Sequence, residues 1–240
     1  MNSRIFRYEV RDELLAIVRE PAALFFTVLM PVAFFALFAA MFGGEGGFGA
    51  GSLATYGAFA ALSVVMMNPG ISFADSRERG WLRVKRADGT PLSVTILAKV
   101  VAALPYAVFT LAGVTAVAWA TAGPLDVLQV VRIVGVLVIG ALPFTLFSLA
   151  VGAKLSPSTS SAVLNAILIP SVIMSGLWFP LELLPSWLGK VAGFMPPYHL
   201  AQLAVAQVEG GTIWSHVGFL AATAIVGAAV AVMAYRSADV

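Results

Sequence analysis

The chain has 240 residues, of which 60% are hydrophobic and only 11% are charged, and its mean hydropathy is +0.94. A soluble domain carries roughly 25% charged residues, so this composition excludes a soluble globular fold and predicts an all-α polytopic membrane protein. Cysteine is absent, which excludes a disulfide framework and a cysteine metal site. The formal net charge of +2 is small, and the positions of the charges are more informative than their sum.

The first expected element is an amphipathic helix over residues 3–20. At about 100° per residue, its apolar side chains fall within one arc and its acidic side chains within another. The apolar arc contains Phe6, Val10, Leu14 and Ile17, and the acidic arc contains Glu9, Asp12, Glu13 and Glu20. Such a helix is expected to lie flat at the membrane interface, and the alternative is a disordered charged tail.

Six apolar runs follow, each long enough to cross a bilayer, which needs about 20 residues. They cover residues 22–42, 54–74, 93–121, 131–153, 160–179 and 213–234. We therefore predict a single transmembrane domain over residues 1–240 with six spans. Asn68 next to Pro69 predicts a break in the second span, and Pro105 favours a tilt or a break in the third.

The segment after the fifth span is apolar but is divided by prolines into pieces too short to cross a membrane. These prolines are Pro180, Pro185, Pro196 and Pro197. Short apolar pieces of this kind are typical of re-entrant or interfacial segments. A hydrophobic loop lying on the membrane is the alternative.

The basic residues predict the orientation of the six spans. Twelve of the 14 lysines and arginines fall on one side, and only Arg132 and Lys190 fall on the other. By the positive-inside rule, both termini and the loop at residues 75–92 are expected in the cytoplasm. The proline-rich segment at residues 180–212 is expected outside.

No Asp, Glu, Lys or Arg lies near the middle of a predicted span, and Lys99 is expected to extend from a span end towards the headgroups. Proton-driven transporters usually keep an ionisable residue in the membrane. The one Gly-Lys pair, Gly189 and Lys190, lacks the pattern of a phosphate-binding loop. If the chain moves a solute uphill, we therefore expect the energy to come from another chain.

Two other classes of protein stay open. Ser175 with His199 or His216 could form the nucleophile and base of an intramembrane serine hydrolase, although such a dyad needs hydrogen-bond contact. Two histidines alone do not make a metal site. A secondary transporter is the third class, because backbone carbonyls could still bind a sodium ion.

Three groups of motifs indicate a family. The first comprises Arg-Glu-Pro at residues 19–21 and Leu-Met-Pro at residues 29–31. The second comprises Asp-Ser-Arg-Glu-Arg-Gly at 75–80, Thr-Pro-Leu-Ser at 90–93, and Lys99. The third runs from Ser-Gly-Leu-Trp-Phe-Pro-Leu-Glu-Leu-Leu-Pro at 175–185 to Met-Pro-Pro-Tyr-His at 195–199. With these motifs the chain resembles the membrane (permease) subunits of type-2 ATP-binding-cassette exporters, which include drug, antibiotic, polysaccharide and teichoic-acid exporters.

The resemblance implies a multi-pass subunit in the cytoplasmic (inner) membrane of a prokaryote, working as a homodimer among membrane lipids. A separate cytoplasmic ATPase would bind ATP and Mg, with no cofactor on this chain. The expected substrate is an amphiphilic compound such as a drug, an antibiotic or a lipid, and a lipid-linked glycan is the alternative. Neither an enzymatic site nor a nucleic-acid partner is expected.

The resemblance also assigns roles to segments of this chain. Residues 75–90 would contain a coupling helix that docks on the ATPase, and residues 3–20 would connect it to the first span. The coupling residues are Asp75, Arg77, Glu78, Arg79, Trp81, Leu82 and Arg83. Trp81 and Leu82 are expected to be the anchors. The residues expected to close the exit are Pro180, Glu182, Pro185, Pro196 and Pro197.

A substrate path is predicted from one helical face of the fifth span. Spacings of four and three residues place Ser161, Asn165, Leu168, Val172 and Ser175 on this face. Asn68 of the second span is a further candidate. A face of mixed polarity suits an amphiphilic substrate between two protomers, and it suits ordinary helix packing equally well.

Overall fold

The fold was obtained as a computed structural model that describes residues 3–19, 25–42 and 49–236. Within these ranges the chain forms helices and no strand. The main helices are α1 (Ser3–Val18), α3 (Met30–Phe42), α4 (Ala50–Glu78), α5 (Trp81–Ala87), α6 (Leu92–Ala122), α7 (Val127–Gly152), α8 (Pro157–Met174), α9 (Ser186–Ala192), α10 (Pro196–Glu209) and α11 (Trp214–Arg236). A π-helical segment, η1 (Phe25–Leu29), precedes α3, and a 3-10 turn, η2 (Leu181–Leu183), precedes α9.

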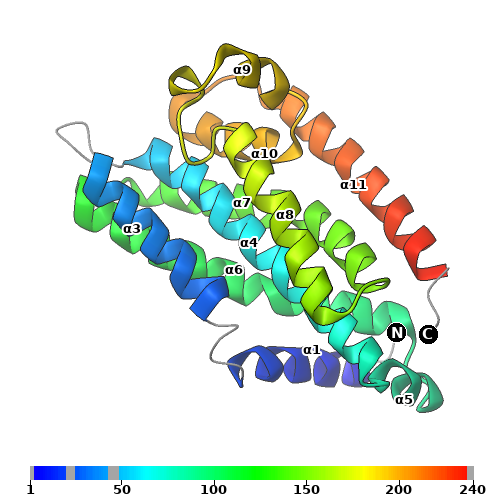
Figure 1. The fold of residues 1–240 in the computed structure, drawn as a ribbon. Coiled ribbons are helices and arrows are strands. Elements are labelled where there is room, and N and C mark those ends of the chain that lie inside the picture. The colour runs from blue at the N-terminus through cyan, green and yellow to red at the C-terminus, as the bar shows by residue number, and fades with distance from the viewer. Residues whose placement is uncertain (1–2, 20–24, 43–48, 237–240) are drawn as a thin grey trace.

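The long helices lie side by side and define two ends of the bundle (Figure 1). Helices α1 and α5 lie at one end, called here the α5 end, and α9 lies at the opposite α9 end. Helix α1 begins and α11 ends at the α5 end, so the chain returns to the end from which it started.

In the described part of the chain, five helices are long and apolar enough to cross a membrane: α4, α6, α7, α8 and α11. The expectation of an all-α polytopic membrane fold is therefore confirmed. The run expected at residues 22–42 is described from Phe25 onwards, as η1 followed by the 13-residue helix α3. Residues 22–24 lie outside the described ranges, and the count of six spans stays a prediction.

Contrary to expectation, proline does not interrupt the long helices. Helix α4 continues through Pro69 and α6 continues through Pro105, so the predicted break at Asn68 was wrong. In a packed bundle, neighbouring helices and polar side chains can satisfy the backbone groups that proline frees. Next to Pro69, the side-chain Oδ1 atom of Asn68 accepts a hydrogen bond from the Thr27 hydroxyl of η1 at 3.1 Å.

Helix α4 is the central helix, since 72% of its apolar stretch is buried, compared with 22% for α8 and 17% for α11. Its tightest contact is with α7, where Gly70 faces Ser148 and Gly152. A Cβ atom on Gly152 would overlap the carbonyl oxygen of Gly70, and one on Gly70 would overlap the backbone of Ser148. The two helices can approach this closely because both residues lack a side chain.

The proline-rich segment folds into short elements that begin at its prolines. Pro180 precedes η2, Pro185 precedes α9, and Pro196 and Pro197 form the first turn of α10. Helix α10, which was not expected as a 14-residue element, packs against α4, α7 and α11. Its inner face buries Leu200, Ala201, Leu203 and Ala204.

A glycine-to-alanine pair on α7 tests the close helix contact. Gly152→Ala should lower the free energy of unfolding by about 1–3 kcal/mol or more, because overpacking here forces backbone against backbone. Gly135→Ala is the matched control, since a Cβ there meets nothing within 4 Å. Equilibrium unfolding in mixed detergent micelles would measure both changes, and equal values for the two variants would contradict the contact.

Candidate functional site

The predicted coupling residues lie at the α5 end on two helices joined by a tight turn. Asp75, Arg77 and Glu78 occupy the last turns of α4, and α5 begins at Trp81. The turn passes through Gly80, whose φ of +76° is in the left-handed region that favours glycine. A chain reversal at this position therefore follows from the local sequence.

Part of this segment forms an exposed surface with both signs of charge. Glu78, Arg79, Trp81 and Arg83 are exposed, and Trp81 as a whole residue is 55% exposed. Arg79 pairs with Asp75 at 2.7 Å along the helix. A large exposed aromatic residue among charged groups is typical of a protein-docking surface. We call these five residues the coupling surface.

Two of the predicted coupling residues face the bundle instead. Leu82 is 4% exposed and packs with Phe73, Leu149 and Ala153. The Arg77 Nη2 atom donates to the carbonyl oxygen of Leu155, between α7 and α8, at 2.8 Å. These contacts hold α5 and the end of α4 against the bundle, and of the two expected anchors Trp81 alone is exposed.

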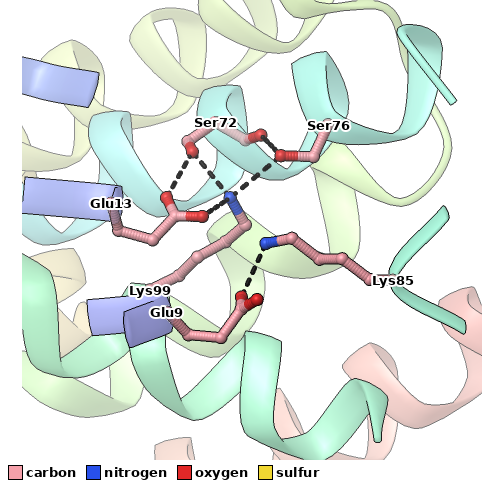
Figure 2. A network of polar contacts seen from close by, with 6 residues as sticks. All are labelled: Glu9, Glu13, Ser72, Ser76, Lys85 and Lys99. Atoms are coloured by element: carbon pink, nitrogen blue, oxygen red, sulfur yellow. Dashed lines mark hydrogen bonds and ion pairs between the residues drawn. The ribbon is translucent and has the colours of Figure 1, made fainter. Parts of the chain in front are cut away.

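A buried polar network lies behind the coupling surface, where α1 crosses α4 and α6 (Figure 2). The Lys99 ammonium of α6 donates to the Glu13 carboxylate of α1 at 2.7 Å. It also donates to the hydroxyls of Ser72 at 2.7 Å and Ser76 at 3.1 Å, both on α4. Ser72 in turn donates to the second Glu13 oxygen at 2.8 Å, and Ser76 donates to the Ser72 carbonyl.

Both charged groups of this network have a full set of hydrogen-bond partners. An ammonium has three donors, and each of the three has an acceptor here. The side chain of Lys99 is 1% exposed and that of Glu13 is 10% exposed. The expectation that Lys99 extends towards the headgroups was therefore wrong. Its position, seven residues or about 10 Å into α6, keeps it near the helix end.

A second ion pair joins α1 to α5. The Lys85 ammonium contacts a Glu9 oxygen at 2.6 Å, and both side chains are less than a quarter exposed. Helix α1 is thus bound to α5 through Glu9 and to α4 and α6 through Glu13 (Figure 2). The sequence contains a signal for this arrangement, because its polar residues are spaced by four. This spacing places Glu13 on the same helical face as Glu9, and Ser76 on the same face as Ser72.

Aromatic and histidine contacts join the segments that meet at the α9 end. The Tyr56 hydroxyl donates to the Trp178 carbonyl at 2.6 Å, and the Trp178 ring packs on Phe34 and Phe59. Of the residues expected to close the exit, Pro197 is buried and Pro196 is half-buried, whereas Pro180, Pro185 and Glu182 are exposed.

A histidine pair connects α10 to α11. The Nδ1 atoms of His199 and His216 lie 2.9 Å apart, and the His199 Nε2 atom lies 2.9 Å from the Gly193 carbonyl. A carbonyl only accepts, so His199 donates from Nε2, and in its neutral form its Nδ1 atom accepts from His216. Both ring nitrogens of His199 are therefore occupied.

This geometry does not form the serine–histidine dyad that the sequence left open. The Ser175 hydroxyl is buried and has no hydrogen-bond partner among the described residues, and His199 is bonded elsewhere. A base must lie within hydrogen-bond reach of its nucleophile. Nor do the described residues bring together three His, Asp or Glu side chains that could hold a metal ion.

The predicted path residues divide between the core and the surface. Leu168, Val172 and Ser175 are at most 3% exposed and face the interior of their own protomer. Asn165 is exposed, and its amide donates to the Ser161 carbonyl at 2.9 Å and to the Met67 sulfur at 3.6 Å. Three of the five residues on this face therefore pack within the bundle, and the substrate path stays a prediction.

Substitutions in the network test its contribution to stability. Lys99→Met or Glu13→Gln alone should cost about 3–5 kcal/mol of unfolding free energy, because each leaves a buried charge without its partner. The double variant should cost less than the sum of the two. Arg79→Met, at the exposed pair, should cost about 0–1 kcal/mol. Unfolding in mixed micelles gives all four values, and a Lys99→Met cost no larger than that of Arg79→Met would contradict a buried pair.

Comparison with known proteins places the chain in a family. A curated relative, "Putative transport permease YvfS" of Bacillus subtilis (strain 168), is 27% identical over 84 residues. This match spans 35% of the chain and 34% of the relative, so the chain covers about a third of that protein. The sequence model described as "ABC-2 type transporter" matches residues 5–208, which include the coupling surface and nearly all of α1 and α10. The chain therefore belongs to the ABC-2 type transporter family.

Proposed function

We propose that the chain is the membrane-spanning subunit of an ATP-driven exporter and that a separate ATP-binding-cassette ATPase docks on its coupling surface. The observation that carries this proposal is the exposed Trp81 on a helix that is fixed to the bundle by Leu82 and to α1 by the Lys85–Glu9 pair. A docking helix held in this way can pass a displacement to α1 and, through Glu13 and Lys99, to α6. Family membership supports a transport subunit of this class.

The ATPase would supply the nucleotide site, with ATP and Mg bound on that chain. The expected cargo is an amphiphilic compound such as a drug, an antibiotic or a lipid, with a lipid-linked glycan as the alternative within the family. A second copy of this chain would complete the pathway. Helix α8 favours such a contact, because much of its apolar surface is exposed.

The orientation is also a proposal: the α5 end faces the cytoplasm of a prokaryote and the α9 end faces outwards. The charge distribution supports this orientation, since the exposed Arg79 and Arg83 lie at the α5 end.

Single introduced cysteines can test the orientation because the natural chain has none. A cysteine at Lys190, on α9, should react with an impermeant maleimide in intact cells, and one at Arg83 should react only after lysis. The reverse pattern would overturn the orientation.

Docking is tested by two matched pairs of variants. Trp81→Ala should weaken binding of the ATPase about 30-fold, as loss of an aromatic anchor typically costs 2 kcal/mol or more. Trp187→Ala is the control, because Trp187 is similarly exposed but lies on α9.

Glu78→Arg should uncouple transport from ATP hydrolysis, because reversing a charge against a matched partner costs several kcal/mol. The control Glu182→Arg, at the α9 end, should leave transport coupled to ATP hydrolysis.

The readouts are the dissociation constant for the purified ATPase and the ATP hydrolysis of the reconstituted complex. Unfolding measurements on each variant separate lost docking from lost folding. If Trp81→Ala and Trp187→Ala bind the ATPase equally well, the coupling surface lies elsewhere. If the purified chain alone drives accumulation of a solute, ATP-driven export is excluded.

A further inference from the structure

Both histidines of the chain lie in one contact, the histidine pair that connects α10 to α11. His199 lies in the first turn of α10 and His216 in the first turn of α11, and their Nδ1 atoms are 2.9 Å apart. Next to this bond the contact is apolar, since Leu200 of α10 and Leu220 of α11 pack beside Gly140 of α7. A proton added to the pair therefore acts directly on the contact between the starts of the two helices.

The ring of His199 is held on several sides. Its Nε2 atom donates to the carbonyl of Gly193, which follows α9, at 2.9 Å. Its face stacks on Phe219 of α11, with the ring centroids 3.9 Å apart, and the Tyr198 ring meets it edge-on at 5.5 Å. Because His199 is 8% exposed, its Nδ1 atom cannot turn to water without leaving these contacts.

The geometry limits how many protons the pair can hold. Each neutral imidazole carries one N–H. That of His199 is on Nε2, so in the neutral pair the Nδ1–H of His216 makes the bond and the Nε2 atom of His216 carries no proton. A third proton can enter at this atom, because His216 is partly exposed. The charged His216 still donates from Nδ1, so the bond survives the first protonation.

A fourth proton has no place while the bond exists. The remaining lone pair is on the Nδ1 atom of His199, and this atom accepts the bond from His216. Protonating it would set two N–H groups and two positive charges against each other at 2.9 Å, and a like charge at such a distance strongly disfavours the charged form. The charged His199 ring still donates from Nε2 to Gly193. The separation therefore falls between α10 and α11, and α9 stays with α10.

Among the described residues, no carboxylate offsets a second charge on the pair. No ion pair or hydrogen bond in this part of the chain joins either ring to a charged side chain. The charged residues on η2, α7, α9 and α10 are all exposed: Glu182, Arg132, Lys190 and Glu209. Helices α4 and α11 carry their charged residues towards the α5 end. Two tyrosines also lie near, Tyr198 beside both rings and Tyr56 of α4, whose hydroxyl donates to the Trp178 carbonyl.

We propose that the histidine pair is a proton-sensitive contact, which holds the start of α10 on α11 until both rings are charged and then releases it. Two groups coupled in this way take up their protons in steps that belong to the pair. With the orientation proposed above, the pair would respond to acid outside the cell. The contact itself does not depend on ATP-driven export, so its test needs no ATPase and its failure would leave the proposed function standing.

Histidine-selective NMR can follow the pair alone, because the chain has no other histidine. The nitrogen shifts of the rings report which atoms carry a proton. For the purified wild-type chain in micelles, we expect the third and fourth protons to enter in two separate steps, each sensed by both rings. In His216→Asn, the His199 signal should show one step. Two wild-type rings that titrate in single, independent steps would contradict the coupling.

Distances between spin labels test whether the second step separates the helices. Labels on cysteines at Lys190 of α9 and Ser215 of α11, both exposed, lie on the two sides of the contact. Labels at Lys190 and Glu209 are the matched control, because α9 and α10 stay joined through Gly193. From about pH 7.5 to about pH 4.5, a range around the ordinary histidine pKa of about 6.5, the first distance should lengthen and the control should not. Dilution with unlabelled chain removes distances between copies.

Two variants of His216 separate this bond from other effects of acid. In His216→Asn, the amide nitrogen takes the place of Nδ1 and donates to neutral His199, and the amide oxygen accepts from the charged ring. This variant should keep the short distance at both pH values. His216→Leu can neither donate nor accept, so it should show the longer distance already at the higher pH.

Three outcomes would overturn the proposal. An unchanged wild-type distance in acid would show that charging the pair does not release α10. An acid response of His216→Asn equal to that of the wild type would assign the change to other groups, such as Glu182 or Glu209. A short distance retained by His216→Leu at both pH values would show that apolar packing alone holds α10 on α11.

Discussion

The close backbone contact between α4 and α7 is the constraint on which the rest of the bundle depends. Gly70 and Gly152 allow the two helices to touch, and α6, α8 and α10 then pack around the α4 surface that remains. In a bilayer there is little hydrophobic force between helices, so close van der Waals packing at small residues must provide much of the attraction. Helices α8 and α11 are sparsely buried, and α11 runs along the edge of the bundle (Figure 1).

The buried network determines the position of α1 on this unit more than it strengthens the attachment of the helix. A buried ion pair recovers its desolvation cost only when its geometry is good and its remaining donors are satisfied. Lys99, Glu13 and Ser72 meet this condition, since every ammonium proton has an acceptor and both carboxylate oxygens have a donor. A shifted α1 would leave these groups unpaired, so the network selects one position for the helix on the bundle.

Hydropathy predicted the long helices well, because apolar length is a local property of the sequence. The five apolar helices begin and end within five residues of the predicted runs. The direction of Lys99 could not be predicted, because its partner Glu13 lies 86 positions away in the sequence. Likewise, Trp81 and Leu82 are adjacent on a seven-residue helix, and periodicity over so short a segment cannot tell which of them faces the bundle. The proposed coupling residues were indicated by a motif, and their division into exposed and inward-facing sets required the fold.

The lengths of α4 and α6 make the protein sensitive to bilayer thickness. With 29 and 31 residues, these helices are about 44 and 46 Å long, whereas the hydrocarbon core measures about 30 Å. Ser72, Ser76 and Lys99 lie within about two turns of the ends of these helices at the α5 end. A longer helix adapts to a thinner bilayer by tilting. Because the network joins α1 to both helices through buried groups, a change in their tilt would move α1 with them.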